Sequence, residues 1–278
     1  MIKNIDQLLQ MALSLDGADK DPTSSAIISP KQQCTATFIT KLPGISCGTE
    51  EVKRLFELVN PSINVDILKE DGRYLSKGDA IICVQGKMID ILRISRVACS
   101  ILDVMGSVAY VAGKYADEIK DLPCQLTTNY KSIPLFEPLI KKALALVNVE
   151  QPNSNLQDYC YLNEAHILTI GSLGDAINQL RKKNLTQPIE AEVINLNEAM
   201  DAINLGVERI ILKDMILEEM QECLKLKREK TLIGTTNLSI GRVREFAKMG
   251  FDYLTIDDLA LNMRSMGIYL KVYKRTLK

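Results

Sequence analysis

Two spacings of apolar residues alternate along this chain, and each predicts a different kind of element. Residues 5–15 and 49–59 carry apolar side chains three and four positions apart, as in amphipathic helices. Polar and apolar residues alternate, or short apolar runs lie between turn residues, at 26–29, 34–40, 65–69 and 80–85. These segments predict strands. The first part of the chain therefore reads as a compact α/β module.

A long apolar segment follows at residues 87–119. Its apolar positions keep the helical period throughout, and they occupy several sides of the helix. A helix of this kind is typically buried between layers of secondary structure.

From about Pro123 the chain repeats a short strand and then a helix. Strands are expected at 124–127, 159–162, 189–193, 209–212, 231–234 and 253–256, and helices at 135–146, 172–183, 196–205, 217–227 and 239–249. LGVERIIL and MGFDYLTI each place a glycine after a helix and an apolar run after that glycine, which is typical of a parallel sheet. Five or six such units in succession indicate a β/α barrel.

These patterns predict an α/β protein with two parts. An N-terminal α/β sandwich module covers residues 1–110, and the stretch at 266–278 returns to it as a strand. A C-terminal β/α barrel covers residues 111–265.

Composition narrows the class of protein. The 34 Lys and Arg residues nearly balance the 35 Asp and Glu residues, so no overall field favours nucleic acid or an anionic membrane. No segment reaches the run of about 18 apolar residues that a membrane helix needs. The N-terminus has an acid at position 6 and lacks a cleavage site, so it is not expected to be a signal peptide.

The seven cysteines are scattered, odd in number and set in apolar surroundings. This arrangement indicates reduced, buried thiols in a cytoplasmic protein. With a single histidine, His166, and no paired thiols, a zinc site is not expected.

The order of several motifs resembles one family. They are EDGRYLSKGDAIICVQG in the first part, NEAHI at 163–167, EAEVINLNEAMDAINLGVERIILKDM and REFAKMGFDYLTI. The chain is similar to the quinolinate phosphoribosyltransferases (carboxylating nicotinate-nucleotide pyrophosphorylases) and their molybdenum-gene-cluster paralogue, over nearly its whole length. The resemblance implies the two-part fold above, and a homodimer in which each first module caps the partner's barrel.

The family's chemistry implies a set of candidate site residues. Phosphoribosyl pyrophosphate and quinolinate are polyanions that need cations, and a carboxylate stabilises the oxocarbenium-like sugar. Matching the motifs by position makes Glu192 the candidate catalytic carboxylate. It makes Arg96, Lys131, His166 and Lys213 candidate contacts to a small-molecule ligand. No cofactor follows from the residues, and Mg²⁺ is expected only if phosphoribosyl pyrophosphate binds.

Many family positions are altered, and several that are cations or glycines in the family are neutral or acidic here. Asn129 occupies the position of a family arginine, and Gln151-Pro152-Asn153 replaces Asn-His-Arg. Lys213-Asp214 replaces Asp-Asn, and Thr235-Thr236-Asn237 replaces a glycine-rich phosphate cradle. Asp257-Asp258 follows the last strand. A carboxylate about 4 Å from a phosphate costs roughly 4 kcal/mol at an effective dielectric of 20. Activity on quinolinate is therefore not expected.

Two functions remain open from the sequence. One is a phosphoribosyltransferase-like enzyme that acts on a different small nitrogenous acceptor. The other is a non-catalytic pseudoenzyme that serves as a dimeric binding or regulatory module. The candidate residues each have two open interpretations. Glu192 either acts at the sugar or pairs with Lys213, and His166 either contacts ligand or belongs to a retained turn at NEAHI.

Overall fold

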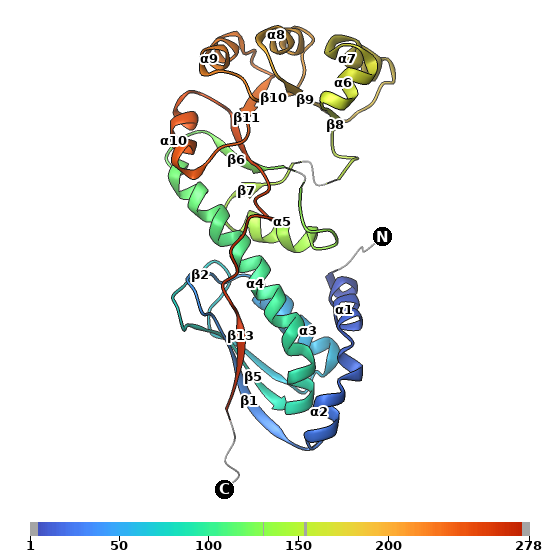
Figure 1. Ribbon diagram of the computed structural model, residues 1–278, viewed down its shortest axis with the longest axis vertical. Coiled ribbons are helices and arrows are strands. Elements are labelled where there is room, and N and C mark those ends of the chain that lie inside the picture. Colours follow the sequence, from blue (N-terminus) through green and yellow to red (C-terminus); the bar gives the residue numbers. More distant parts are fainter. Residues whose placement is uncertain (1–4, 130, 153–154, 274–278) are drawn as a thin grey trace. The chain divides into compact units, whose positions relative to one another are not determined.

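The structure is a computed structural model that describes residues 5–129, 131–152 and 155–273. The chain divides into two compact units, labelled by element in Figure 1. The first contains Met1–Val111, Ile133–Val147 and Asn262–Lys278, and the second contains Ala112–Ser132 and Asn148–Leu261. Helix α4 (Met88–Ile119) begins in the first unit and ends in the second.

An antiparallel sheet forms the centre of the first unit. Its strand order is β13 (Tyr269–Tyr273), β1 (Gln33–Ile39), β5 (Ala80–Lys87) and β3 (Asn64–Ile67). The pairing of β13 with β1 runs from Thr35 opposite Tyr273 to Ile39 opposite Tyr269. The predicted return of the C-terminal segment as a strand is therefore confirmed.

Helices and a small two-stranded antiparallel sheet complete the first unit. They are α1 (Ile5–Asp16), the short 3₁₀ helix η1 (Ala18–Lys20), α2 (Pro22–Ile27), α3 (Thr49–Val59), the first part of α4, α5 (Glu137–Ala145), and the paired strands β2 (Gly44–Ile45) and β4 (Tyr74–Leu75). The apolar faces predicted for α1 and α3 are buried, with Leu9 and Phe56 fully enclosed. Phe56 packs edge-to-face on Phe38 of β1.

The strand predicted at 26–29 is wrong, because this segment follows a strong helix start. The Asp21 carboxylate accepts hydrogen bonds from the backbone N–H groups of Thr23 and Ser24, and Pro22 occupies the first helical position. Side-chain capping and proline at the first position together favour a helix over a strand.

A curled sheet of seven strands forms the second unit. The order is β7 (Val149–Glu150), β6 (Gln125–Thr128), β12 (Tyr253–Ile256), β11 (Leu232–Thr235), β10 (Arg209–Leu212), β9 (Ile189–Val193) and β8 (Cys160–Leu162). All the pairings are parallel. Strands β7 and β8 are the two edges, so the expected barrel is present as a half-barrel.

Helices cover the outer face of this sheet. They are α7 (Leu173–Lys182), α8 (Leu196–Asn204), α9 (Leu217–Leu226) and α10 (Ile240–Lys248), and α7, α8 and α9 lie side by side in Figure 1. Each buries an apolar stripe, such as Ala199, Ala202 and Ile203 of α8. The remaining helix, α6 (Glu164–Ile170), lies beside α7 and has no buried residue.

Alternate residues of the strands share the inner face of the curled sheet. At its base, Arg209 of β10 donates to Glu190 of β9 over 3.0 Å, and its guanidinium lies 4.0 Å from the ring centre of Tyr253 on β12. Gly234 makes room for that ring, because a Cβ there would lie 2.3 Å from it. Two residues further along β12 and β6, the hydroxyls of Thr127 and Thr255 meet at 2.9 Å.

Among the described helices, α4 alone is long and apolar enough to cross a membrane by length and composition. Of its most apolar window, 56% is buried inside the protein. Ile94, Ala98 and Met105 are fully enclosed. The buried core helix of a globular protein meets the same criterion, and this agrees with the predicted position of residues 87–119 between layers.

Candidate functional site

Three side chains meet where strands β8, β9 and β10 end. Glu192 lies near the end of β9, and one of its carboxylate oxygens accepts a hydrogen bond from the Tyr161 hydroxyl of β8 at 2.5 Å. The other oxygen accepts from the Lys213 Nζ, just after β10, at 3.1 Å. Parallel strands bring their carboxyl ends to one edge of a sheet, which explains why residues so far apart in the chain converge.

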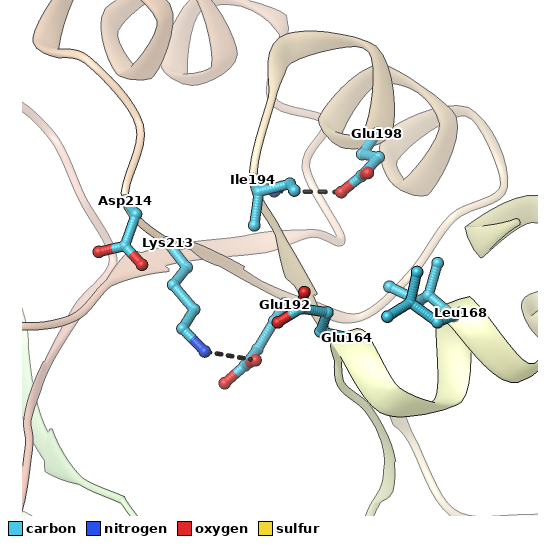
Figure 2. Close-up of a pocket in the computed structure, with 8 residues that line it drawn as sticks. Glu164, Leu168, Glu192, Ile194, Glu198, Lys213 and Asp214 are labelled. Carbon is cyan, nitrogen blue, oxygen red and sulfur yellow. Dashed lines mark hydrogen bonds and ion pairs between the residues drawn. The ribbon is translucent and has the colours of Figure 1, made fainter.

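A pocket of about 440 Å³ opens beside Glu192 and Lys213 (Figure 2). Its lining residues are Glu164, Ile167, Leu168, Glu192, Ile194, Glu198, Lys213 and Asp214. Figure 2 shows Lys213 reaching across to Glu192, while the Glu198 carboxylate holds the Ile194 N–H. Four carboxylates and one ammonium group line the pocket, so it favours neutral or cationic ligands over anionic ones.

Lys213 is held in its charged form. The hydrogen bond that Lys213 donates to Glu192, reinforced by the charges of Glu192, Asp214 and Glu164, raises the pKa of Lys213 against the opposing effect of burial. The Glu192 side chain is 16% exposed, and that of Lys213 is 36% exposed. The ammonium group is therefore both charged and already paired.

His166 lies on the first turn of α6. Asn163 is the N-cap: its side-chain oxygen accepts from the His166 N–H at 3.2 Å and lies 2.7 Å from Nδ1 of the imidazole. NEAHI, expected as a turn, is thus the capping box of a helix. Glu164, Ile167 and Leu168 of the same helix line the pocket, but His166 does not.

Lys131 belongs to a second cluster, where β6, β12 and β11 end. Its Nζ lies 3.1 Å from a carboxylate oxygen of Asp258. The neighbouring Asp257 carboxylate accepts hydrogen bonds from Asn129, from Thr236 and from the Asn237 N–H. Lys131 was expected as a ligand contact, and in the structure its ammonium group lies against a carboxylate.

Arg96 lies on α4 in the first unit. Its guanidinium pairs with Asp16 at 3.2 Å, and the arginine side chain is 80% exposed. Gln151 follows β7 and is buried, whereas Asn153, named with it above, lies outside the described residues. Within the second unit, the structure thus brings Glu192 and Lys213 into contact and places Lys131 in a separate cluster.

Three hydrogen-bond donors to these carboxylates were missed from the sequence. Tyr161 was not expected to hold Glu192, although both lie on strands predicted to be neighbours. Thr236 and Asn237 were seen only as replacements for glycines, and not as donors to Asp257. For Tyr161 and Glu192, the parity of inward-facing positions on adjacent strands was the available signal. Thr236, Asn237 and Asp257 lie past the ends of β11 and β12, where strand parity gives none.

Among the described residues, no group of three or more His, Cys, Asp or Glu side chains is placed to hold a metal ion.

Comparison with known proteins places the chain in a family. Residues 21–105 match the family model for the quinolinate phosphoribosyl transferase N-terminal domain, and residues 108–271 match that for the C-terminal domain. The chain belongs to the quinolinate phosphoribosyl transferase family. The resemblance seen in the sequence is therefore confirmed.

Two curated relatives of this quinolinate phosphoribosyl transferase family member have similar lengths. A probable carboxylating nicotinate-nucleotide pyrophosphorylase from Synechocystis is 26% identical over 257 residues, covering 90% of this chain and 86% of the relative. A second protein of the same description, from Archaeoglobus fulgidus, is 26% identical over 259 residues, covering 90% and 99%.

Solved structures share the fold of this family member. NadC from Streptococcus pyogenes superimposes with a TM-score of 0.88 at 24% identity, covering 97% of both chains. The nicotinate-nucleotide pyrophosphorylase from Ehrlichia chaffeensis gives a TM-score of 0.91 at 22% identity, covering 98% of this chain and 100% of that one.

Proposed function

We propose that this chain is a divergent family member that does not transfer a phosphoribosyl group to quinolinate. The observation that carries the proposal is the pairing of Lys213 with Glu192 at 3.1 Å, since Lys213 is the single cation among the described residues that line the pocket. Three further carboxylates line the same pocket. Each one about 4 Å from an anionic group of a ligand disfavours binding by roughly 4 kcal/mol at an effective dielectric of 20.

The same pocket suits a different acceptor. Ile167, Leu168 and Ile194 offer apolar surface, and Glu192 offers a carboxylate held in place by Tyr161 and Lys213. A fixed carboxylate stabilises positive charge that develops at a sugar carbon or rests on a ring nitrogen. We therefore assign Glu192 to charge stabilisation, and the acceptor to small nitrogenous compounds that lack the two carboxylates of quinolinate. Arg96, Lys131, His166 and Lys213 stay predicted ligand contacts.

A second candidate is a non-catalytic binding module built on the same fold. The closed cluster around Asp257 supports it, because its donors are occupied by the chain's own carboxylate. Under this second function the pocket binds a ligand but no sugar donor is cleaved.

One set of measurements separates these functions. Calorimetry with phosphoribosyl pyrophosphate and Mg²⁺ measures donor binding, and a pyrophosphate-release assay measures turnover with quinolinate or with nitrogen heterocycles that lack carboxylates. We expect no release with quinolinate. Release with a heterocycle that disappears in Glu192→Gln, which keeps the side-chain shape but removes its charge, supports the enzyme. If the protein neither binds phosphoribosyl pyrophosphate nor releases pyrophosphate, that result supports the binding module.

Quinolinate-dependent pyrophosphate release by the wild-type chain would refute the proposal. The altered side chains would then form a competent site of a different composition.

A further inference from the structure

The Asp257 carboxylate has the surroundings of a bound anion. It lies just past the end of β12, and one of its oxygens accepts the Thr236 hydroxyl at 2.5 Å and the Asn237 N–H at 3.0 Å. Its other oxygen accepts the Asn129 side-chain amide at 2.8 Å. Three donors from two other strand ends thus converge on one carboxylate.

These donors are of the kinds that hold oxyanions in proteins. A backbone N–H, a hydroxyl and a side-chain amide each donate to phosphate or carboxylate oxygens. Asn237 adopts a left-handed backbone conformation with φ of 60°. Asn129 is further held by the N–H groups of Lys131 and Asp258, which donate to its amide oxygen and leave its NH₂ directed at the carboxylates.

Asp258, the adjacent acid, is held differently. Its carboxylate pairs with Lys131 at 3.1 Å and lies 3.4 Å from the Asn129 amide nitrogen. The Asn237 N–H and the Thr236 hydroxyl donate to Asp257. The anion-like position therefore belongs to Asp257.

We propose that Asp257 is a tethered anion that fills an oxyanion cradle made by Asn129, Thr236 and Asn237. As long as its carboxylate remains, phosphate does not bind there, because the donors are taken and a like charge occupies the space. Removing the carboxylate opens the cradle to inorganic phosphate. The inference rests on hydrogen-bond geometry and holds whether the chain is an enzyme or a binding module.

The experiment compares two substitutions at this position. Asp257→Ala removes the carboxylate and frees the Thr236 hydroxyl, the Asn237 N–H and the Asn129 N–H that points at Asp257, while the Asn129 amide nitrogen still lies 3.4 Å from an Asp258 oxygen. Asp257→Asn removes the charge but keeps an oxygen that can accept the same hydrogen bonds, so the cradle stays filled. The Asn237 backbone amide is followed by ¹⁵N NMR as inorganic phosphate is added, with chloride at equal ionic strength as the salt control.

We expect phosphate to shift the Asn237 amide in Asp257→Ala, with an affinity at least about tenfold above that of wild type and of Asp257→Asn. Should Asp257→Ala be too unstable for NMR, the melting temperature gives the same answer. Phosphate then raises the Tm of Asp257→Ala and leaves the other two proteins unchanged, because a ligand stabilises only the state that binds it.

Three results would overturn the inference. One is a folded Asp257→Ala variant that shows neither an amide shift nor a Tm increase with phosphate. Another is phosphate binding to wild type as tight as to Asp257→Ala. The third is equal phosphate binding by Asp257→Ala and Asp257→Asn, which would show that only the charge, and not occupation of the donors, keeps phosphate out.

Discussion

Arg209 and Glu190 form an ion pair at the base of the curled sheet, where water is nearly excluded. Glu190 is 2% exposed and Arg209 is 7% exposed. Two aromatic rings, those of Tyr253 and Tyr159, also lie against the guanidinium. Burial works against the charged form of Arg209, and the surrounding groups overcome it, so that its pKa is raised. Each member of the pair needs the other.

Arg209→Leu is expected to destabilise the protein by about 3–5 kcal/mol, because it leaves a buried carboxylate without its cation. The double substitution Arg209→Leu with Glu190→Leu should recover much of that loss, since no unpaired charge then remains. Urea unfolding of the wild type, both single variants and the double variant measures the coupling. If the losses of stability in the two single variants add up to the loss in the double variant, Arg209 and Glu190 are not coupled.

At the scale of elements, Arg244 ties α10 to the end of α4. Its guanidinium binds the Asp121 carboxylate through two hydrogen bonds, at 2.6 and 2.7 Å, and also donates to the Glu118 carbonyl. Asp121 lies two residues beyond the end of α4, so the contact joins the C-terminal end of that helix to an outer helix of the half-barrel. The hydrogen bond from Arg244 lowers the pKa of Asp121 to about 2.

This contact has a defined pH dependence. A lowered folded-state pKa means that the contact stabilises the fold above the ordinary value of 3.8 and that this stabilisation is lost as the pH falls towards about 2. NMR titration should find the Asp121 carboxyl pKa near 2 in wild type and raised towards the ordinary value of 3.8 in Arg244→Gln. An unchanged Asp121 pKa in that variant would rule out Arg244 as the cause.

Most elements could be predicted from the sequence because their signals are local. Four elements have the expected bounds: the strands at 189–193, 209–212 and 253–256 and the helix at 49–59. Their apolar runs and helical spacing can be recognised from neighbouring residues alone. The strand predicted at 26–29 failed because capping by Asp21 outweighed a short apolar run. Strand β7 and helix α6 were not expected, because β7 has two residues and α6 buries none.

At the scale of the whole molecule, the family resemblance predicts a homodimer. Features of the first unit support this proposal. The Arg96 side chain, which pairs with Asp16, is 80% exposed. Leu15, next to Asp16 in the chain, is 79% exposed, and Ile27 of α2 is 77% exposed. Arg93, one turn from Arg96, contacts Ser25 two residues before Ile27. A cationic side chain among exposed apolar ones is typical of an interface.

Light scattering after size exclusion should therefore give twice the chain mass of 31.0 kDa. Leu15→Glu with Ile27→Glu is expected to weaken the dimer, because it places charges on the apolar part of that surface. Leu226→Glu, at an exposed position of α9 in the other unit, is the matched control and should leave the mass unchanged. A wild-type protein that runs at 31.0 kDa at micromolar concentration would contradict the prediction.

The sequence by itself determined the family, the two kinds of unit and most of the elements, because these depend on spacing and order along the chain. It also identified which family cations and glycines are replaced. Only the tertiary structure decided what the replacements do. Glu192 pairs with Lys213 across two strands, and Asp257 accepts donors from two other strand ends. These contacts join residues about 20 to 130 positions apart, and no local pattern specifies such pairings, because they depend on strand order and on which face each side chain occupies.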